Sequence, residues 1–342
     1  PEHPKNIRLC FARASRIMPV KFNSTGAKTM NANRAIPAVP RGAWRKRVWK
    51  NRMMYLMLLI PLAMLILFKY VPMYGVQIAF RNFLPGRSIW ESEWVGLRYI
   101  VNFFNSYNFW TLLKNTLVLG LYNVAVFPCA LILAICVNYL RNKKFQKVVQ
   151  TISYLPHFIT MVVMCSIILQ MFDARTGLFN AVMGLFGVQP RNYMGIPGAF
   201  KHIYIWTSVW QDIGYASIIY IASLSGVSPE LHEAATIDGA TLLKRIWHVD
   251  LPALLPTICV LLIMRCGAML NVGYEKVYLL QNPMNLNASE IINTYVYKQG
   301  LTSGLPQYSS ATAIGLFVSL VNMVILVIVN RLSGAISGNS LW

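Results

Sequence analysis

Charged side chains are scarce in this 342-residue sequence. Asp, Glu, Lys and Arg make up 12% of it, whereas a soluble domain carries about 25%. Hydrophobic residues make up 56%, and several apolar runs reach the roughly 20 residues that a helix needs to cross a hydrocarbon core. The sequence has none of the short alternating segments that a transmembrane barrel requires. The composition therefore predicts an all-α, polytopic membrane protein.

The sequence also lacks the patterns of several catalytic and metal-binding classes. Its six cysteines are scattered without a CxxC pair, which argues against a disulfide framework or a cysteine metal site. No G-x-x-x-x-G-K-[ST] loop for ATP and no G-x-S-x-G nucleophile turn is present. His232 and Glu233 begin like the zinc motif H-E-x-x-H, but Thr236 replaces its second histidine. We therefore expect no catalytic residue, metal or cofactor in this chain.

Acidic residues are rarer than basic ones, 11 against 31, and the basic ones are unevenly placed. Thirteen precede Met53, where Glu2 is the only acid. Such a segment before a first span is ordinarily a cytoplasmic anchor to anionic lipid, which disfavours nucleic-acid binding. Residues 1–52 are therefore predicted to be a disordered cytoplasmic arm. The later loops alone would not decide the topology, but this arm and the basic run Arg141–Lys147 predict that both termini are cytoplasmic.

About six transmembrane helices are predicted within a membrane domain of residues 53–332, and residues 333–342 are expected to form a cytoplasmic tail. The predicted spans are Met53–Tyr70, Trp110–Leu140, Thr151–Met171, Phe200–Leu224, Pro252–Leu270 and Ser309–Asn330.

The polar segment 225–252 lies between the fourth and fifth predicted spans, on the predicted cytoplasmic side. Ser228 as N-cap and Pro229 at the first helical position predict a short helix that ends near Ile237. Gly239 predicts a turn, because glycine takes positive φ without penalty. Two alanines keep the helix slim, so another protein could approach its backbone closely. Shape alone leaves a docking element and a solvated connection equally open.

The residues of this segment resemble the EAA loop of ABC-importer permeases. The positions in register are Glu233, Ala234, Ala235, Asp238, Gly239, Ala240, Leu251, Pro252 and Pro256. Other segments are similar to the oligosaccharide-uptake branch of these permeases, which includes importers of alginate oligosaccharides. They include "VPMYGVQIAFRNFLPG", "YLPHFIT" and "NPMNLNASEIINTYVYKQGL". The resemblance covers most of the chain from about Arg45 onward.

The resemblance implies a transmembrane permease domain of the bacterial inner membrane with a cytoplasmic EAA coupling helix. It implies three kinds of partner: a second, different permease subunit, two ATPase subunits that hold ATP and Mg, and an extracytoplasmic sugar-binding protein. The implied function is the passage of an oligosaccharide, including acidic ones such as alginate fragments, into the cytoplasm. In this family the loop docks into a cleft of the ATPase. The alternative is a secondary transporter or channel without an ATPase, which the scarcity of buried acids disfavours.

Polar side chains within the predicted spans are candidates for a sugar path, because such groups usually face a cavity or a partner helix. Arg265 would suit an acidic sugar such as a uronate, and the alternative is an ion pair with an acid such as Asp212. Aromatic rings stack on sugars, and amides and carboxylates bond hydroxyls, although tryptophans also serve as interfacial anchors. The further candidates are Gln211, Asp212, Trp206, Trp210, Asn271, Tyr274 and Glu275, with Gln170, Asn123 and Lys114 as weaker ones.

Overall fold

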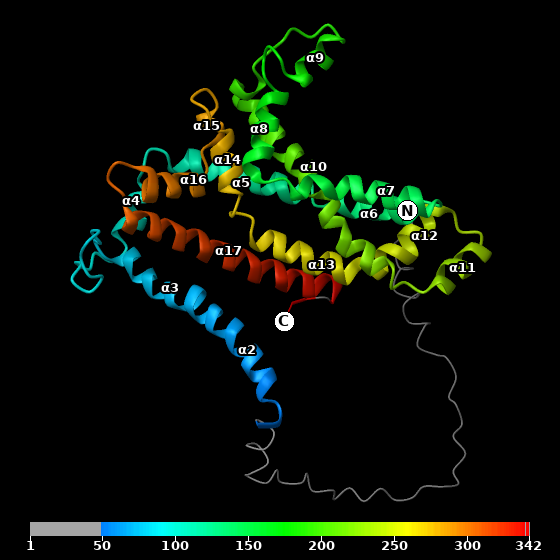
Figure 1. Cartoon of the computed structure of the whole chain (residues 1–342), viewed down its shortest axis with the longest axis horizontal. Coiled ribbons are helices and arrows are strands. Elements are labelled where there is room, and N and C mark those ends of the chain that lie inside the picture. The colour runs from blue at the N-terminus through cyan, green and yellow to red at the C-terminus, as the bar shows by residue number, and fades with distance from the viewer. Residues whose placement is uncertain (1–48, 339, 342) are drawn as a thin grey trace, which may run out of the picture. The chain divides into compact units, whose positions relative to one another are not determined.

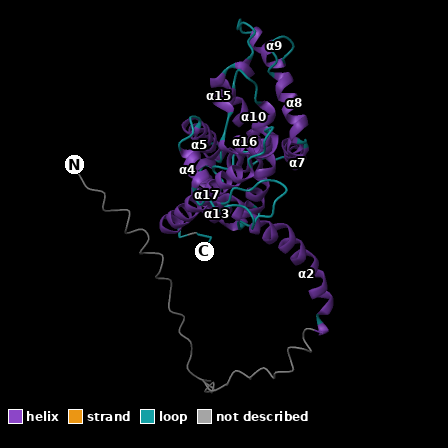
Figure 2. Cartoon of the chain, turned by 90° about the vertical axis from the view of Figure 1, so that its left-hand side faces the viewer, coloured by secondary structure: helices purple, strands orange, loops and turns teal. Residues whose placement is uncertain are grey.

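The computed structural model describes residues 49–338 and 340–341, and every regular element among them is a helix (Figure 2). The predicted all-α class is thereby confirmed. The chain divides into two compact units, one that ends at Leu67 and one that starts at Phe68. The arm predicted at residues 1–52 falls almost entirely outside the described residues.

In the first unit, helix α2 (Arg52–Leu65) has no buried side chain. Its sequence, RMMYLMLLIPLAML, is apolar on all sides apart from its first residue, which is typical of a helix that faces lipid. It begins the apolar helical stretch Arg52–Phe80, which includes the first predicted span.

The second unit contains the remaining helices. They are α3 (Val71–Met73), α4 (Arg98–Phe104), α5 (Phe109–Ala125), α6 (Pro128–Asn138), α7 (Lys143–Tyr154), α8 (Met161–Met171), α9 (Leu178–Gly184), α10 (Pro197–Leu224), α11 (Pro229–Ile237), α12 (Leu242–Arg245), α13 (Leu251–Gly267), α14 (Tyr274–Leu280), α15 (Leu286–Ser289), α16 (Ile292–Tyr297) and α17 (Tyr308–Ser337). A π-helical turn, Ile246–Asp250, joins α12 to α13.

Four described helical stretches are long and apolar enough to cross a membrane, and a bent pair of helices would make a fifth. The four are Arg52–Phe80, Phe109–Asn138, Leu242–Gly267 and Tyr308–Ala335. Helix α10 covers the predicted fourth span but is not among them. It carries polar side chains along its length, including Lys201 and Asp212. The structure therefore supports a polytopic helical protein and leaves the number six a prediction.

The third predicted span, Thr151–Met171, is not one straight helix. Helices α7 and α8 meet at an angle of 102° across a short break. Pro156 lies in the 3₁₀ turn that ends α7, and Ile159 and Thr160 both have extended backbone angles. Proline lacks an amide donor and so interrupts the hydrogen bonds of the helix, and the chain turns where Ile159 and Thr160 leave helical geometry.

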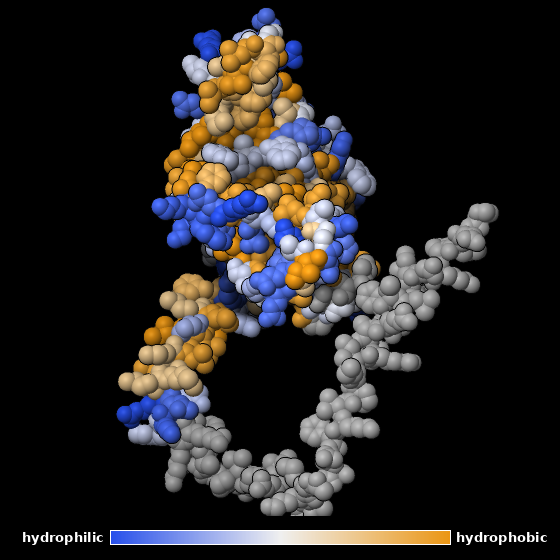
Figure 3. Space-filling view, turned by 90° about the vertical axis from the view of Figure 1, so that its right-hand side faces the viewer, coloured by the Kyte–Doolittle hydropathy of each residue, from blue (hydrophilic) through white to orange (hydrophobic). Residues whose placement is uncertain are grey.

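Helix α10 lies at the centre of the second unit, packed against α6, α7 and α13 (Figure 1). Helix α17 runs along α13 (Figure 1). Buried residues of α6, α10 and α13, among them Ala134, Tyr220 and Leu254, form one apolar cluster. Apolar side chains also cover much of the molecular face seen in Figure 3. Exposed apolar residues of the second unit include Ile218 and Ile219 of α10 and Leu255 of α13. Such surfaces fit lipid or another membrane subunit.

Close packing between α7 and α10 depends on Gly214. A Cβ atom at this position would lie 2.1 Å from the carbonyl oxygen of Ser153. We expect Gly214→Ala to separate the helices and lower the free energy of unfolding by about 2 kcal/mol, the usual cost of overpacking. Gly198, also in α10, would place a Cβ in open space, so Gly198→Ala is the matched control. Thermal unfolding in detergent measures both, and equal midpoints would contradict the prediction.

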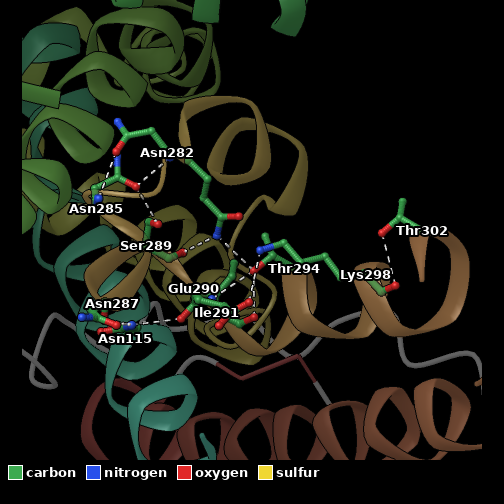
Figure 4. Close-up of polar contacts among 11 residues, drawn as sticks. Asn115, Asn282, Asn285, Asn287, Ser289, Glu290, Ile291, Thr294, Lys298 and Thr302 are labelled. Carbon is green, nitrogen blue, oxygen red and sulfur yellow. Dashed lines mark hydrogen bonds and ion pairs between the residues drawn. The ribbon is translucent and has the colours of Figure 1, made fainter. Parts of the chain in front are cut away.

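The segment from α14 to α16 is fixed by its own polar side chains (Figure 4). Asn285 accepts a hydrogen bond from Ser289 (3.0 Å), and Lys298 Nζ lies 3.1 Å from Glu290 Oε1. Asn115 of α5 donates to the carbonyl oxygens of Asn287 and Glu290, each at 2.9 Å. These bonds tie the segment to α5, and its buried residues Val277, Leu280 and Ile291 also belong to an apolar cluster of the second unit.

Candidate functional site

A cavity of about 250 Å³ lies between α5, α6, α8, α10, α13 and α14. Apolar residues such as Phe127 and Ile213 form part of its wall. Its polar and charged lining residues are Asn123, Tyr204, Ser208, Gln211, Asp212, Arg265 and Lys276. Three of the predicted path residues, Gln211, Asp212 and Arg265, are thus brought together, and Asn123, a weaker candidate, joins them.

Arg265 extends from α13 to α5 and bonds to Asn123. Its Nη2 donates to the carbonyl oxygen of Asn123 at 3.3 Å and also to the side-chain oxygen. Its Nε is buried and has no hydrogen-bond partner. The alternative pairing with Asp212 is not formed, because Asp212 Oδ1 lies 3.0 Å from Nδ1 of His157. His157 is held there by stacking on Tyr215, with ring centroids 3.9 Å apart.

Lys276 of α14 is a second cation in this cavity, and sequence reasoning missed it. Only 2% of the residue is exposed. Its Nζ donates to Ser208 Oγ at 2.8 Å and lies 5.4 Å from the ring centre of Tyr204. Burial lowers the pKa of Lys276 to about 8, so the amine is mostly protonated near pH 7. Among the described residues, neither Arg265 nor Lys276 forms an ion pair.

The other predicted path residues do not line this cavity. Trp206 and Trp210 are 54% and 45% exposed on α10. Asn271 and Glu275 are also exposed. Tyr274 lines a different pocket, of about 420 Å³, with Tyr297 and Tyr308. The weaker candidates Gln170 and Lys114 line two further pockets.

Helix α11 has the bounds and the end signals that the sequence predicts. Ser228 Oγ accepts a hydrogen bond from the amide of Glu230, and Pro229 is the first residue of the helix. Gly239 follows with φ of +74°, and a Cβ there would meet nothing within 4 Å. Its conformation, rather than a lack of space, therefore favours glycine. The amide of Ala240 closes the turn on the carbonyl oxygen of Ala235 at 2.9 Å.

The predicted coupling residues lie on the surface around this helix. Glu233, Ala234, Asp238 and Gly239 are exposed, and Ala235 is half-buried. Leu251 and Pro252 begin α13, directly after the π-helical turn Ile246–Asp250.

A buried polar cluster lies beneath α11, centred on Asp250, which is fully buried. Tyr139, just past the end of α6, donates to Asp250 Oδ2 at 2.6 Å. His232 Nε2 of α11 lies 3.4 Å from Asp250 Oδ1. Burial, followed by the bond to Asp250, raises the pKa of Tyr139 to about 12, so its hydroxyl remains a donor. The guanidinium of Arg245 lies 5.9 Å from the centre of the Tyr139 ring.

This cluster has no metal-binding geometry. Within the described part of the chain, no group of three His, Cys, Asp or Glu side chains could hold a metal ion. Sequence reasoning noted His232 only as half of an incomplete zinc motif. Its partner is Asp250, a residue 18 positions away in the chain.

Residues 126–338 match the family described as "Binding-protein-dependent transport system inner membrane component". The polygalacturonan/rhamnogalacturonan transport system permease protein YteP of Bacillus subtilis is 41% identical over 83% of this chain and 88% of its own length. Protein LplB of the same organism is 38% identical over 87% of this chain and 95% of its own.

Solved structures agree with the sequence relatives. A chain of a bacterial alginate ABC transporter, in complex with an alginate pentasaccharide-bound periplasmic protein, is similar with a TM-score of 0.79. It is 34% identical, and the match covers 86% of this chain and 99% of that one. The chain therefore belongs to the family of binding-protein-dependent transport system inner membrane components, the permease subunits of ABC importers.

Proposed function

We propose that this permease subunit passes an acidic oligosaccharide from an extracytoplasmic binding protein to the cytoplasm. It does so beside a second permease subunit, and two separate ATPase subunits supply the energy. Both of its termini lie in the cytoplasm. A solved relative belongs to a transporter involved in the import of the acidic polysaccharide alginate, and a relative found by sequence is a polygalacturonan/rhamnogalacturonan permease. These relatives support a sugar as the substrate, and the cations of the cavity support a negatively charged one.

The observation that carries the acidic substrate is the charge of the cavity wall. Within the described part of the chain, Arg265 and Lys276 are two cations without an ion-pair partner, whereas Asp212 faces His157. A carboxylate of the sugar would give both cations a charged hydrogen-bond acceptor, and such bonds are about twice as strong as neutral ones. Ser208 and Gln211 supply further groups for sugar hydroxyls.

The proposed coupling surface is formed by Glu233, Ala234 and Ala235 of α11 and by Asp238 and Gly239, which follow the helix. Slim side chains let an ATPase cleft approach the helix closely. Leu251 and Pro252 lead from this segment into α13, the helix that carries Arg265. A rigid-body movement imposed on α11 would therefore reorient one wall of the cavity, as alternating access requires.

The test is uptake by the complete importer in proteoliposomes, with its binding protein outside and ATP inside. Acidic oligosaccharides are compared with carboxyl-reduced versions of the same length. We expect ATP-dependent uptake of the acidic sugars that exceeds that of the reduced ones by at least about tenfold, the loss of one charged hydrogen bond. Equal uptake of the two would contradict the acidic substrate. Uptake without ATP would favour a secondary transporter or channel.

A further inference from the structure

Helix α11 is not held in place by apolar burial. None of its residues is buried, and its two large apolar side chains, Leu231 and Ile237, are 55% and 86% exposed. A helix of nine residues is marginal in isolation, so contacts with neighbouring elements must stabilise its position. Polar contacts on its inner side provide them.

Two residues of α11 make these contacts. His232 Nε2 lies 3.4 Å from Asp250 Oδ1. Thr236 Oγ1 accepts a hydrogen bond from Arg245 at 3.2 Å and donates to the carbonyl oxygen of His232 at 2.7 Å. The contacts with Asp250 and Arg245 thus lie one turn apart on the same helix.

The backbone connection between α11 and α13 is poorly suited to transmit force by itself. It passes through the turn at Gly239 and then through Thr241, which has extended backbone angles. Asp250 lies directly before α13, and its contact with His232 links α13 to α11 without passing through the backbone at Gly239 and Thr241. Tyr139 holds the other oxygen of the same carboxylate at the end of α6.

A fully buried carboxylate is costly unless its charge is compensated. The hydroxyl of Tyr139 donates to Asp250 Oδ2, whereas Asp250 Oδ1 has no hydrogen-bond partner among the described residues and faces the imidazole of His232 at 3.4 Å. Removal of His232 would leave the carboxylate with Tyr139 alone, so the three residues act as a unit.

We infer that Asp250 is a positioning residue for energy coupling: with His232 and Tyr139 it fastens α11 to the end of α6 and the start of α13. A displacement of α11 then moves α13. Arg265 lies on α13, about 22 Å from Asp250 along the helix axis at 1.5 Å per residue. This inference rests on the proposed coupling role of α11.

The experiment uses the complete importer in proteoliposomes and measures sugar uptake per ATP hydrolysed. We expect His232→Ala and Asp250→Asn each to lower this ratio by about tenfold, because each alters the polar contact between His232 and the buried Asp250 side chain. His232→Lys, which places an amine within reach of the Asp250 carboxylate, should retain most of it. The matched control is His248→Ala, since His248 contacts only the carbonyl oxygen of Lys244 among the described residues. It should stay within about twofold of wild type.

The double variant with His232→Ala and Asp250→Asn should be no worse than either single variant, because the neutral amide no longer needs compensation. An unchanged uptake-to-ATP ratio in both single variants would overturn the inference. The inference would also be overturned if the variants assembled less complex but the assembled complex kept a normal ratio of uptake to ATP hydrolysis. The cluster would then only stabilise the structure.

Failure of the inference can be told apart from failure of the coupling role by Gly239→Asp in the same assay. If this variant uncouples transport while His232→Ala does not, α11 couples and Asp250 does not position it. If Gly239→Asp also transports normally, the coupling role of α11 itself is wrong.

Discussion

Glu233→Lys is expected to leave the permease inserted in the membrane while sugar-stimulated ATP hydrolysis and sugar uptake fall by about a hundredfold. The side chain is exposed, and among the described residues it forms no hydrogen bond or ion pair. Reversal of the Glu233 charge should therefore change the free energy of unfolding little. A docked ATPase that pairs with the carboxylate would instead meet a like charge, which costs several kcal/mol.

Two variants control this result. Glu230→Lys reverses a charge in the first turn of the same helix. This change removes the favourable interaction of an acid with the helix dipole, which contributes about 0.3–1 kcal/mol to helix stability. Glu233→Gln keeps the shape and a hydrogen-bond acceptor, so partial activity should remain. Membrane insertion and the sugar-stimulated ATPase rate of the reconstituted importer are measured together. Normal stimulation in Glu233→Lys would remove Glu233 from the coupling surface.

The ends of α11 could be predicted from the sequence because their signals are local. Ser228 acts on an amide two residues away, and Pro229 fits the first turn without any contact elsewhere. Gly239 likewise adopts positive φ with open space around it. Each signal depends on backbone geometry within one or two turns, so no tertiary information was needed.

The bend between α7 and α8 was missed although Pro156 was visible. Proline kinks are common inside membrane helices, where neighbouring helices satisfy the freed backbone groups. The sequence therefore could not distinguish a kinked span from a chain that turns by 102°.

Lys276 and Asp250 were missed for a different reason. Both lie outside the predicted spans, where charged residues are ordinarily solvated. The structure buries them through partners far away in the chain: Ser208 for Lys276, and Tyr139 for Asp250. Arg265 was recognised because a cation within an apolar run is unusual wherever it packs. Its bond to Asn123, by contrast, depends on how α5 and α13 meet.

One helix joins the proposed coupling surface to the cavity. Helix α13 begins next to Asp250, under α11, and carries Arg265 in its last turn. Its other neighbours, α10 and α17, also pack along it. A shift of α13 would therefore change the position of Arg265 relative to Lys276, which is held by α14 and Ser208 of α10. Arg265 and Lys276 could then lie close enough to bind one carboxylate in one state of the transporter and too far apart to share it in another.

Lys276→Met should weaken uptake of acidic oligosaccharides by about tenfold to a hundredfold, as expected for a lost hydrogen bond to a charged group. The folded chain should tolerate the change, because Ser208 Oγ still donates to the carbonyl oxygen of Tyr204 at 2.8 Å. Methionine is flexible enough to fill the space of the lysine stem. The loss should appear as a raised KM for acidic sugars, with uptake of carboxyl-reduced sugars unchanged.

Arg265→Met should have the same selectivity, with a larger cost to folding because the side-chain oxygen of Asn123 loses its donor. Arg265→Lys keeps the charge and should retain more acidic-sugar uptake than Arg265→Met. The control is Lys114→Met, since Lys114 is exposed on α5 and lines a separate pocket. Initial uptake rates over a range of sugar concentrations separate KM from kcat. If acidic and carboxyl-reduced sugars lose uptake equally in Lys276→Met, the cations shape the cavity and do not recognise the carboxylate.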